Sequence, residues 1–145
     1  MSFVLTKQVV QNIFESTENA LRFVEKSKDM SPELVLSDPR KSIAFKYGYL
    51  VVLQSILTLS NYVVVKKKLG IPKDYLESLQ FLVTAKILPK NLTEKLKLLV
   101  EMRDTTLHRS ASITLTDIKN MIENIETVKE IYQTIKTEVQ KLLGA

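Results

Sequence analysis

An arginine, an aspartate and the only histidine of the chain lie within residues 103–110, a segment with the sequence RDTTLHRS. Histidine titrates near neutral pH and can act as a base or an acid, whereas arginine is a permanent cation. Asp104 lies four residues before His108, so on a helix its carboxylate can orient the imidazole. Arg103, Asp104 and His108 are therefore the residues whose types and spacing could support acid–base chemistry beside a fixed positive charge.

Arg103 also has a purely structural interpretation. It occupies the next position of an apolar helical stripe that is formed by Leu92, Leu96 and Leu99. A charge on such a stripe is costly unless something pairs with it. The arginine therefore either forms a salt bridge, to Glu101, Asp104 or an acid on another helix, or points toward a partner surface.

His108 has an alternative role as well, because a histidine near a helix end is commonly a capping or surface residue. On an ideal helix, Arg103 and His108 lie about 140° apart. Their side chains could still converge through their own reach, through a helix that ends near Thr105 and Thr106, or through a second protomer.

Prolines, glycines and capping residues divide the chain into five predicted helices. They cover approximately residues 3–28, 39–70, 72–88, 91–110 and 114–145. Asp38-Pro39 is a typical N-cap and first helical residue, Asn91 with Glu94 is a second predicted start, and Ser31-Pro32 could begin one short turn. These patterns predict an all-α, up-and-down bundle that forms one domain over residues 1–145, with the motif region at 91–110.

The segment 47–65 contains no charged residue and is long enough to span a bilayer. However, Gln54, Thr58 and Asn61 recur at helical spacing and would leave a polar stripe unsatisfied in lipid. We therefore expect a central buried helix with no membrane contact. The first seven residues do not resemble a secretory signal, which predicts a cytoplasmic protein.

Composition excludes several classes of site. The chain has no cysteine and one histidine, so a thiol nucleophile, a Cys-based zinc site and a multi-histidine metal site are not expected, and neither is a cofactor. The net charge of +5 and the pI near 9.3 permit an RNA, DNA or acidic partner. Arg109 and the run Lys66, Lys67 and Lys68 are candidate RNA contacts, although cations also suit a helix C-terminus.

The motif resembles the signature of HEPN-domain ribonucleases, in which an arginine, a polar residue and a histidine follow one another at this spacing. The flanking segments LGIPKDY (69–75) and ILPKNL (87–92) make the region from Pro39 to the last helix similar to the HepT-like branch. This resemblance implies a homodimeric, metal-independent endoribonuclease that cleaves RNA by attack of the 2′-OH in a dimer cleft. It also implies a toxin whose partner is an MntA-like nucleotidyltransferase antitoxin.

Two positions depart from the branch. Its members often carry a tyrosine two residues after the histidine, the site that the antitoxin modifies, and Ser110 stands there in this chain. An acidic residue is common in the middle of the long helix, where Gln54 stands here. Modification would therefore need Ser110 or another hydroxyl, and Gln54 could bond near the motif without acting as a base. The alternatives are a non-catalytic HEPN module that binds a nucleotidyltransferase or nucleic acid, and a purely structural helical adaptor.

Overall fold

The computed structural model describes residues 5–144, and within this range the chain is helical and has no strand. The α-helices are α1 (Lys7–Glu25), α2 (Pro32–Ser37), α3 (Pro39–Lys66), α4 (Tyr75–Thr84), α5 (Thr93–His108), α6 (Leu115–Glu123) and α7 (Ile125–Gly144). Short 3₁₀ turns lie at Lys26–Asp29, Lys90–Leu92 and Ser110–Ser112. The predicted all-α class is confirmed.

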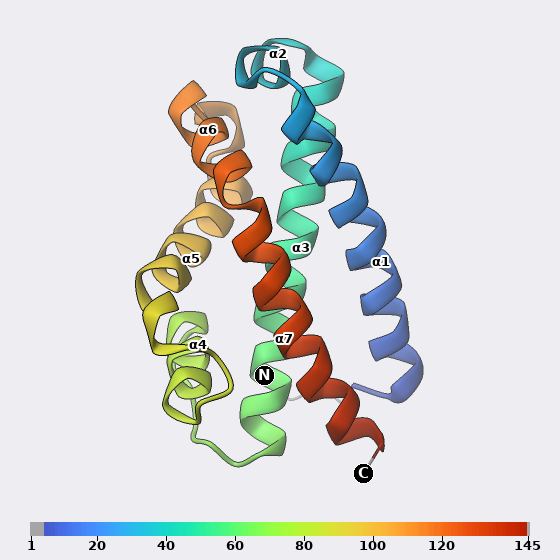
Figure 1. The fold of residues 1–145 in the computed structure, drawn as a ribbon, viewed down its shortest axis with the longest axis vertical. Helices are drawn as coiled ribbons and strands as arrows, with labels where there is room; N and C mark the ends of the chain where they lie inside the picture. Colours follow the sequence, from blue (N-terminus) through green and yellow to red (C-terminus); the bar gives the residue numbers. More distant parts are fainter. Residues whose placement is uncertain (1–4, 145) are drawn as a thin grey trace.

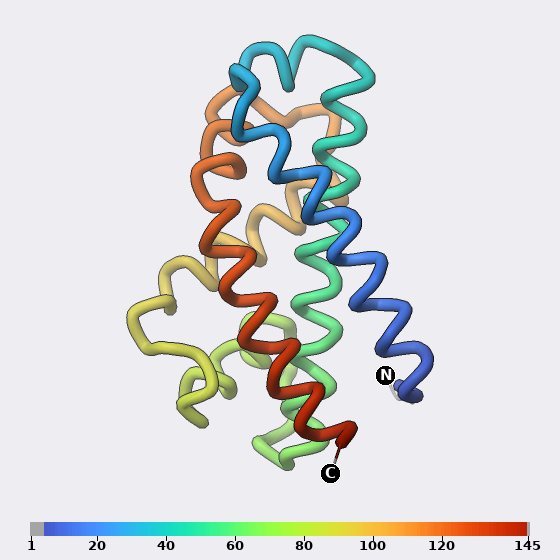
Figure 2. The backbone as a smooth tube through the Cα atoms, turned by 45° about the vertical axis from the view of Figure 1, so that its right-hand side comes forward, coloured from blue at the N-terminus to red at the C-terminus, as the bar shows by residue number. Residues whose placement is uncertain are grey.

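The four long helices run up and down in turn, with α3 at the centre (Figures 1 and 2). Helix α3 packs against α1, α2, α4, α5 and α7. Helices α2 and α6 contact each other at one end of the bundle, and α4 lies at the other end (Figure 1). The up-and-down arrangement therefore agrees with the prediction.

Seven α-helices are described where five were predicted, and two features explain the difference. Ser31 accepts a hydrogen bond from the backbone N–H of Leu34 and Pro32 follows it, so the expected short turn becomes helix α2. The predicted last helix is divided at Asn124, whose side-chain Nδ2 donates to the Asn120 carbonyl at 2.7 Å. A side chain that bonds to the preceding turn competes with the helical backbone, and α7 restarts at the next residue.

Capping explains most helix starts. Asp38 accepts hydrogen bonds from the N–H groups of Arg40 and Lys41, with Pro39 at the first position of α3, as predicted. The predicted cap at Asn91 is wrong, because α5 starts at Thr93 after a 3₁₀ turn and its N-cap position has no side-chain bond. The predicted start of the first helix at residue 3 lies outside the described residues.

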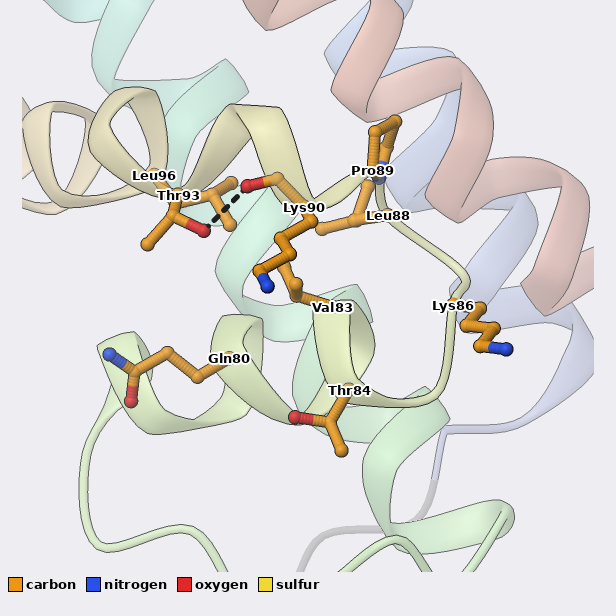
Figure 3. A pocket seen from close by; sticks show the side chains of 9 residues that line it. All are labelled: Gln80, Val83, Thr84, Lys86, Leu88, Pro89, Lys90, Thr93 and Leu96. Carbon is orange, nitrogen blue, oxygen red and sulfur yellow. Dashed lines mark hydrogen bonds between the residues drawn. The ribbon is translucent and has the colours of Figure 1, made fainter.

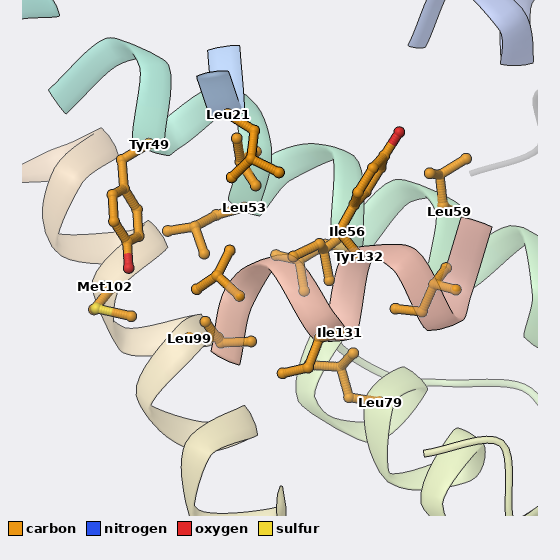
Figure 4. Packing of buried hydrophobic residues seen from close by; sticks show 14 of the residues in the cluster. Leu21, Tyr49, Leu53, Ile56, Leu59, Leu79, Leu99, Met102, Ile131 and Tyr132 are labelled. Atoms are coloured by element: carbon orange, nitrogen blue, oxygen red, sulfur yellow. The ribbon is translucent and has the colours of Figure 1, made fainter. Parts of the chain in front are cut away.

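The core is built around α3. Figure 4 shows buried side chains of α3, α5 and α7, among them Leu53, Leu99 and Ile131, filling the space between these helices. Helix α3 is long and apolar enough to cross a membrane by composition, yet 56% of its most apolar window is buried inside the bundle. The protein therefore uses this segment as its core helix.

Candidate functional site

Helix α5 carries the candidate motif on its last two turns, and the guanidinium of Arg103 makes contacts to three side chains. Its Nε donates to Gln54 Oε1 at 3.0 Å, and its Nη1 donates to Asp104 Oδ1 at 2.9 Å. Its Cζ lies 5.2 Å from the centroid of the Tyr75 ring, a cation–π contact. Three helices, α3, α4 and α5, therefore meet at one arginine.

The polar stripe of α3 supports this meeting point. Gln54 Nε2 lies 3.5 Å from both the Tyr75 hydroxyl and Thr58 Oγ1. Two turns beyond Gln54, Asn61 Oδ1 accepts a hydrogen bond of 3.2 Å from Ser78 Oγ of α4. The stripe that argued against a membrane span thus faces α4 and α5, where its polar groups find partners.

Arg103 is neither fully buried nor free. Its side chain is 17% exposed, whereas the Asp104 side chain is 52% exposed, so the ion pair lies at the rim of the bundle. The structural interpretation, a salt bridge to Asp104, is therefore correct for the single chain. Among the described residues no acceptor contacts Nη2 of Arg103.

His108 is the last residue of α5 and is exposed. Within the described part of the chain its imidazole makes no hydrogen bond, and the Asp104 carboxylate pairs with Arg103. Orientation of the imidazole by Asp104 stays a prediction. An imidazolium at this position would interact favourably with the C-terminal end of the helix dipole.

The turn after His108 is fixed by a lysine that sequence reasoning did not select. Lys46 Nζ of α3 donates to the Ser110 carbonyl at 3.1 Å. Arg109 Nη2 contacts Thr105 Oγ1 at 3.3 Å, and Ser110 is exposed. The only sequence signal for Lys46 was its place beside the uncharged stretch of α3. Lys46 and Arg109 therefore make the surroundings of His108 basic.

The lysine run at residues 66–68 lies elsewhere. It follows Lys46 by 20 residues along α3, which corresponds to about 30 Å of helix. Lys67 pairs with Glu138 at 3.5 Å, and Lys66 lies 5.9 Å from the centroid of the Tyr62 ring. Within one chain these lysines do not join the motif, so their contact with RNA stays a proposal for a long substrate.

Next to the motif lies a cavity of about 190 Å³ with Met102, Thr105 and Thr106 of α5 on its wall. Two larger cavities also reach this part of the bundle without enclosing the motif. The larger, of about 590 Å³, lies between α4 and the start of α5, with Val83, Leu88 and Leu96 on its walls (Figure 3). A groove of about 350 Å³ follows α3 and includes Gln54, the partner of Arg103. Among residues 5–144 no group of three or more His, Cys, Asp or Glu could hold a metal ion.

Helix α3 also presents an apolar surface that leads to Gln54. Ile43 and Tyr47 are 70% and 68% exposed, and Leu50 and Val51 follow them at helical spacing. Leu107 of α5 is also exposed. We call Ile43, Tyr47, Leu50 and Val51 the α3 stripe. Contiguous apolar surface of this kind is typical of a protein interface.

Comparison with known proteins agrees with the helical architecture. One similar solved structure is a toxin–antitoxin complex with AMP-PNP, with a TM-score of 0.77 and 14% identity over 90% of this chain and 99% of the other. Another is the tri-AMPylated Shewanella oneidensis HEPN toxin in complex with the MNT antitoxin, with a TM-score of 0.76 and 14% identity over 91% and 99%. At this identity the likeness shows a shared fold. A search of curated proteins found no match.

The match to a sequence family identifies the protein more specifically than the structural likeness does. Residues 14–138, which include α3 to α6 and the whole Arg103–His108 motif, match the family described as ribonuclease HepT-like. The similar structures are HEPN toxins or toxin–antitoxin complexes, and the match covers most of the chain. This protein therefore belongs to the ribonuclease HepT-like family.

Proposed function

We propose that the protein is a metal-independent endoribonuclease and the toxin of a pair whose antitoxin is an MntA-like nucleotidyltransferase. The observation that carries this proposal is the placement of Arg103 and His108 at the exposed end of α5 in a HepT-like chain. His108 would move the proton of the RNA 2′-OH, which attacks the adjacent phosphorus and expels the 5′-oxygen. Arg103 would stabilise the charge that develops on the phosphate.

The reaction needs one group to remove a proton and another to supply one, and each chain has a single histidine. A homodimer would bring two copies of the motif to one cleft. The α3 stripe supports this arrangement, because its exposed Ile43 and Tyr47 lie on the helix that holds Gln54 beside Arg103. A second copy that covers the stripe would place its own α5 near the same groove.

Control by the partner would act on the same end of the molecule. One of the similar structures is a toxin–antitoxin complex with AMP-PNP, and another contains a tri-AMPylated toxin. In this chain the hydroxyl of Ser110, exposed and two residues after His108, is the proposed acceptor. A nucleotidyl group there would add negative charge and bulk beside His108 and exclude RNA. We propose that the protein and its partner act in the cytoplasm.

A non-catalytic HEPN module that binds a nucleotidyltransferase or nucleic acid is the second candidate. The specific observation in its favour is that Asp104 pairs with Arg103 and leaves His108 without a partner among the described residues. In that case Arg103 would have a structural role and the exposed end of α5 would serve as a docking surface.

Cleavage of single-stranded RNA in EDTA separates the two candidates. His108→Ala should lower the rate about 10²–10⁴-fold, and Arg103→Ala should also be inactive. Arg22→Ala, which removes an arginine of α1, is the matched control and should keep full activity. The wild-type product should end in a 2′,3′-cyclic phosphate or its hydrolysis product. Equal cleavage by wild type and His108→Ala would favour the non-catalytic module.

A charge introduced on the α3 stripe tests the proposed dimer. Ile43→Glu places a charge on the exposed stripe, so light scattering should show a shift from dimer to monomer, with loss of RNA cleavage. Val65→Glu, at an exposed aliphatic residue near the far end of α3, is the control and should stay dimeric. A wild-type monomer at micromolar concentration would contradict the dimer.

A further inference from the structure

We infer that Tyr75 and Gln54 are positioning residues that hold the guanidinium of Arg103 in the orientation that binds a phosphate. This inference rests on the proposed ribonuclease function and adds two residues, on α4 and α3, to its site. We call the three side chains the arginine clamp.

The ring of Tyr75 limits one motion of Arg103. With Cζ 5.2 Å from the ring centroid, the guanidinium lies over the aromatic side chain, within the range of a favourable cation–π contact. Both groups are planar and half-buried, so the ring restricts how far the guanidinium can swing toward α4. The N–H groups of a guanidinium lie in its own plane, so the ring restrains the group without taking up a donor.

Gln54 limits a second motion of Arg103, the rotation of its guanidinium. Its Oε1 accepts from Arg103 Nε at 3.0 Å, while its Nε2 lies 3.5 Å from the Tyr75 hydroxyl. One amide therefore contacts both other members of the clamp and fixes rotation about the Cδ–Nε end of the arginine. Because glutamine is neutral, it holds the guanidinium without adding a second negative charge to that of Asp104, which already pairs with Nη1.

Tyr75 is itself well fixed. It is the first residue of α4, and the Asp74 side chain caps this helix by accepting from the Glu77 N–H at 2.8 Å. One turn later the buried Ser78 bonds to Asn61 of α3. These contacts attach the start of α4 to the central helix, so the tyrosine ring is a rigid support for Arg103.

The clamp also explains which way the arginine faces. Asp104, mostly exposed, takes Nη1, and Gln54 takes Nε, whereas Nη2 contacts no acceptor among the described residues. The unused edge is thus held in one direction before substrate binds. A preorganised donor contributes more in the transition state than a mobile one, because no reorganisation is needed when the charge develops.

Two variants test the clamp. Tyr75→Leu removes the aromatic face, and Gln54→Ala removes the acceptor of Nε. The matched control is Tyr62→Leu, which removes an equal ring from the separate contact with Lys66 on α3. Tyr75→Phe keeps the ring and loses only the 3.5 Å contact of the hydroxyl with Gln54, so its effect should be much smaller than that of Tyr75→Leu.

The first measurement is the NMR signal of the Arg103 Nε–H group, assigned by its loss in Arg103→Ala. It should be present and slow to exchange in the wild type, and shifted and faster in Tyr75→Leu and Gln54→Ala, but not in Tyr62→Leu. An unchanged signal in both clamp variants would overturn the inference. This readout does not depend on catalysis.

The second measurement is RNA cleavage. Both clamp variants should lower kcat about 10-fold, equivalent to about 1.4 kcal/mol of activation free energy, with KM little changed. A rise in KM without a loss of kcat would contradict a positioning role. If Arg103→Ala cleaves RNA like the wild type, the proposed function fails, and the NMR signal still decides whether the clamp exists.

Discussion

Glu18 of α1 provides a stability test that is independent of catalysis. Its Oε2 accepts hydrogen bonds from Lys136 Nζ at 2.6 Å and from the Tyr132 hydroxyl at 2.7 Å, both on α7. Burial raises the pKa of Glu18, but the hydrogen bonds from Lys136 and Tyr132, with the charges of Lys136 and Arg22, lower it further than burial raises it. The net result is a carboxylate whose pKa lies below its ordinary value of 4.5.

The perturbation is Glu18→Gln, which keeps an acceptor oxygen and removes the charge. Hydrogen bonds to a charged group contribute about 1.5–3 kcal/mol against about 0.5–1.5 for neutral ones. Because the Glu18 side chain is 31% exposed, solvent screening reduces this difference. We expect a loss of about 1–2 kcal/mol in unfolding free energy at pH 7, or about 2–8 °C in Tm for a chain of this size.

The assay is thermal unfolding by circular dichroism at pH 7 and at pH 3. A carboxylate whose pKa is lower in the folded than in the unfolded state stabilises the protein above the unfolded pKa, and this contribution disappears as the pH falls through the folded value. The difference in Tm between wild type and Glu18→Gln should therefore be full at pH 7 and smaller at pH 3. Glu15→Gln, an exposed carboxylate on the same helix, should show no difference. An equal Tm difference at both pH values would refute the reasoning.

Three further substitutions test the packing, each by urea denaturation. Gly70→Ala should lower the unfolding free energy by about 1–3 kcal/mol, because its φ is +150° and a Cβ would lie 2.9 Å from the Phe81 ring; no loss would mean that the ring moves aside. Lys68→Gly should raise it by about 1 kcal/mol, because Lys68 has a left-handed φ of 55°; a decrease would show that the lysine side chain stabilises the turn. Tyr49→Phe should lower it by about 1–2 kcal/mol, because the buried hydroxyl donates to the Met121 carbonyl at 2.7 Å, and an unchanged midpoint would argue against that bond.

Much of the helical framework follows from local sequence. Asp38 and Pro39 start α3 because a carboxylate can bond the first free N–H groups and proline fits the first turn. The buried face of the last helices is likewise written in local spacing, since the buried Ile118, Val128 and Ile135 belong to a series of apolar residues three or four apart. These features depend on neighbours within one or two helical turns, so the sequence determines them directly.

The break at Asn124 was not predictable in the same way. An asparagine interrupts a helix only where its side chain gains enough elsewhere, and here Lys95 of α5 donates to Asn124 Oδ1 at 3.0 Å while Nδ2 bonds to Asn120. The partner on α5 is 29 residues away in sequence. A pattern of apolar spacing carries no information about such a contact.

In the candidate site, too, some features follow from the local sequence and others only from tertiary contacts. The sequence determined which residues could act, Arg103, Asp104 and His108, because their types and spacing are local. Only the tertiary structure decided that Asp104 pairs with Arg103 and that Gln54, 49 residues away, holds the Nε of that arginine. On an isolated helix Asp104 can reach either neighbour, and the choice depends on where the packing of α3 against α5 places the guanidinium.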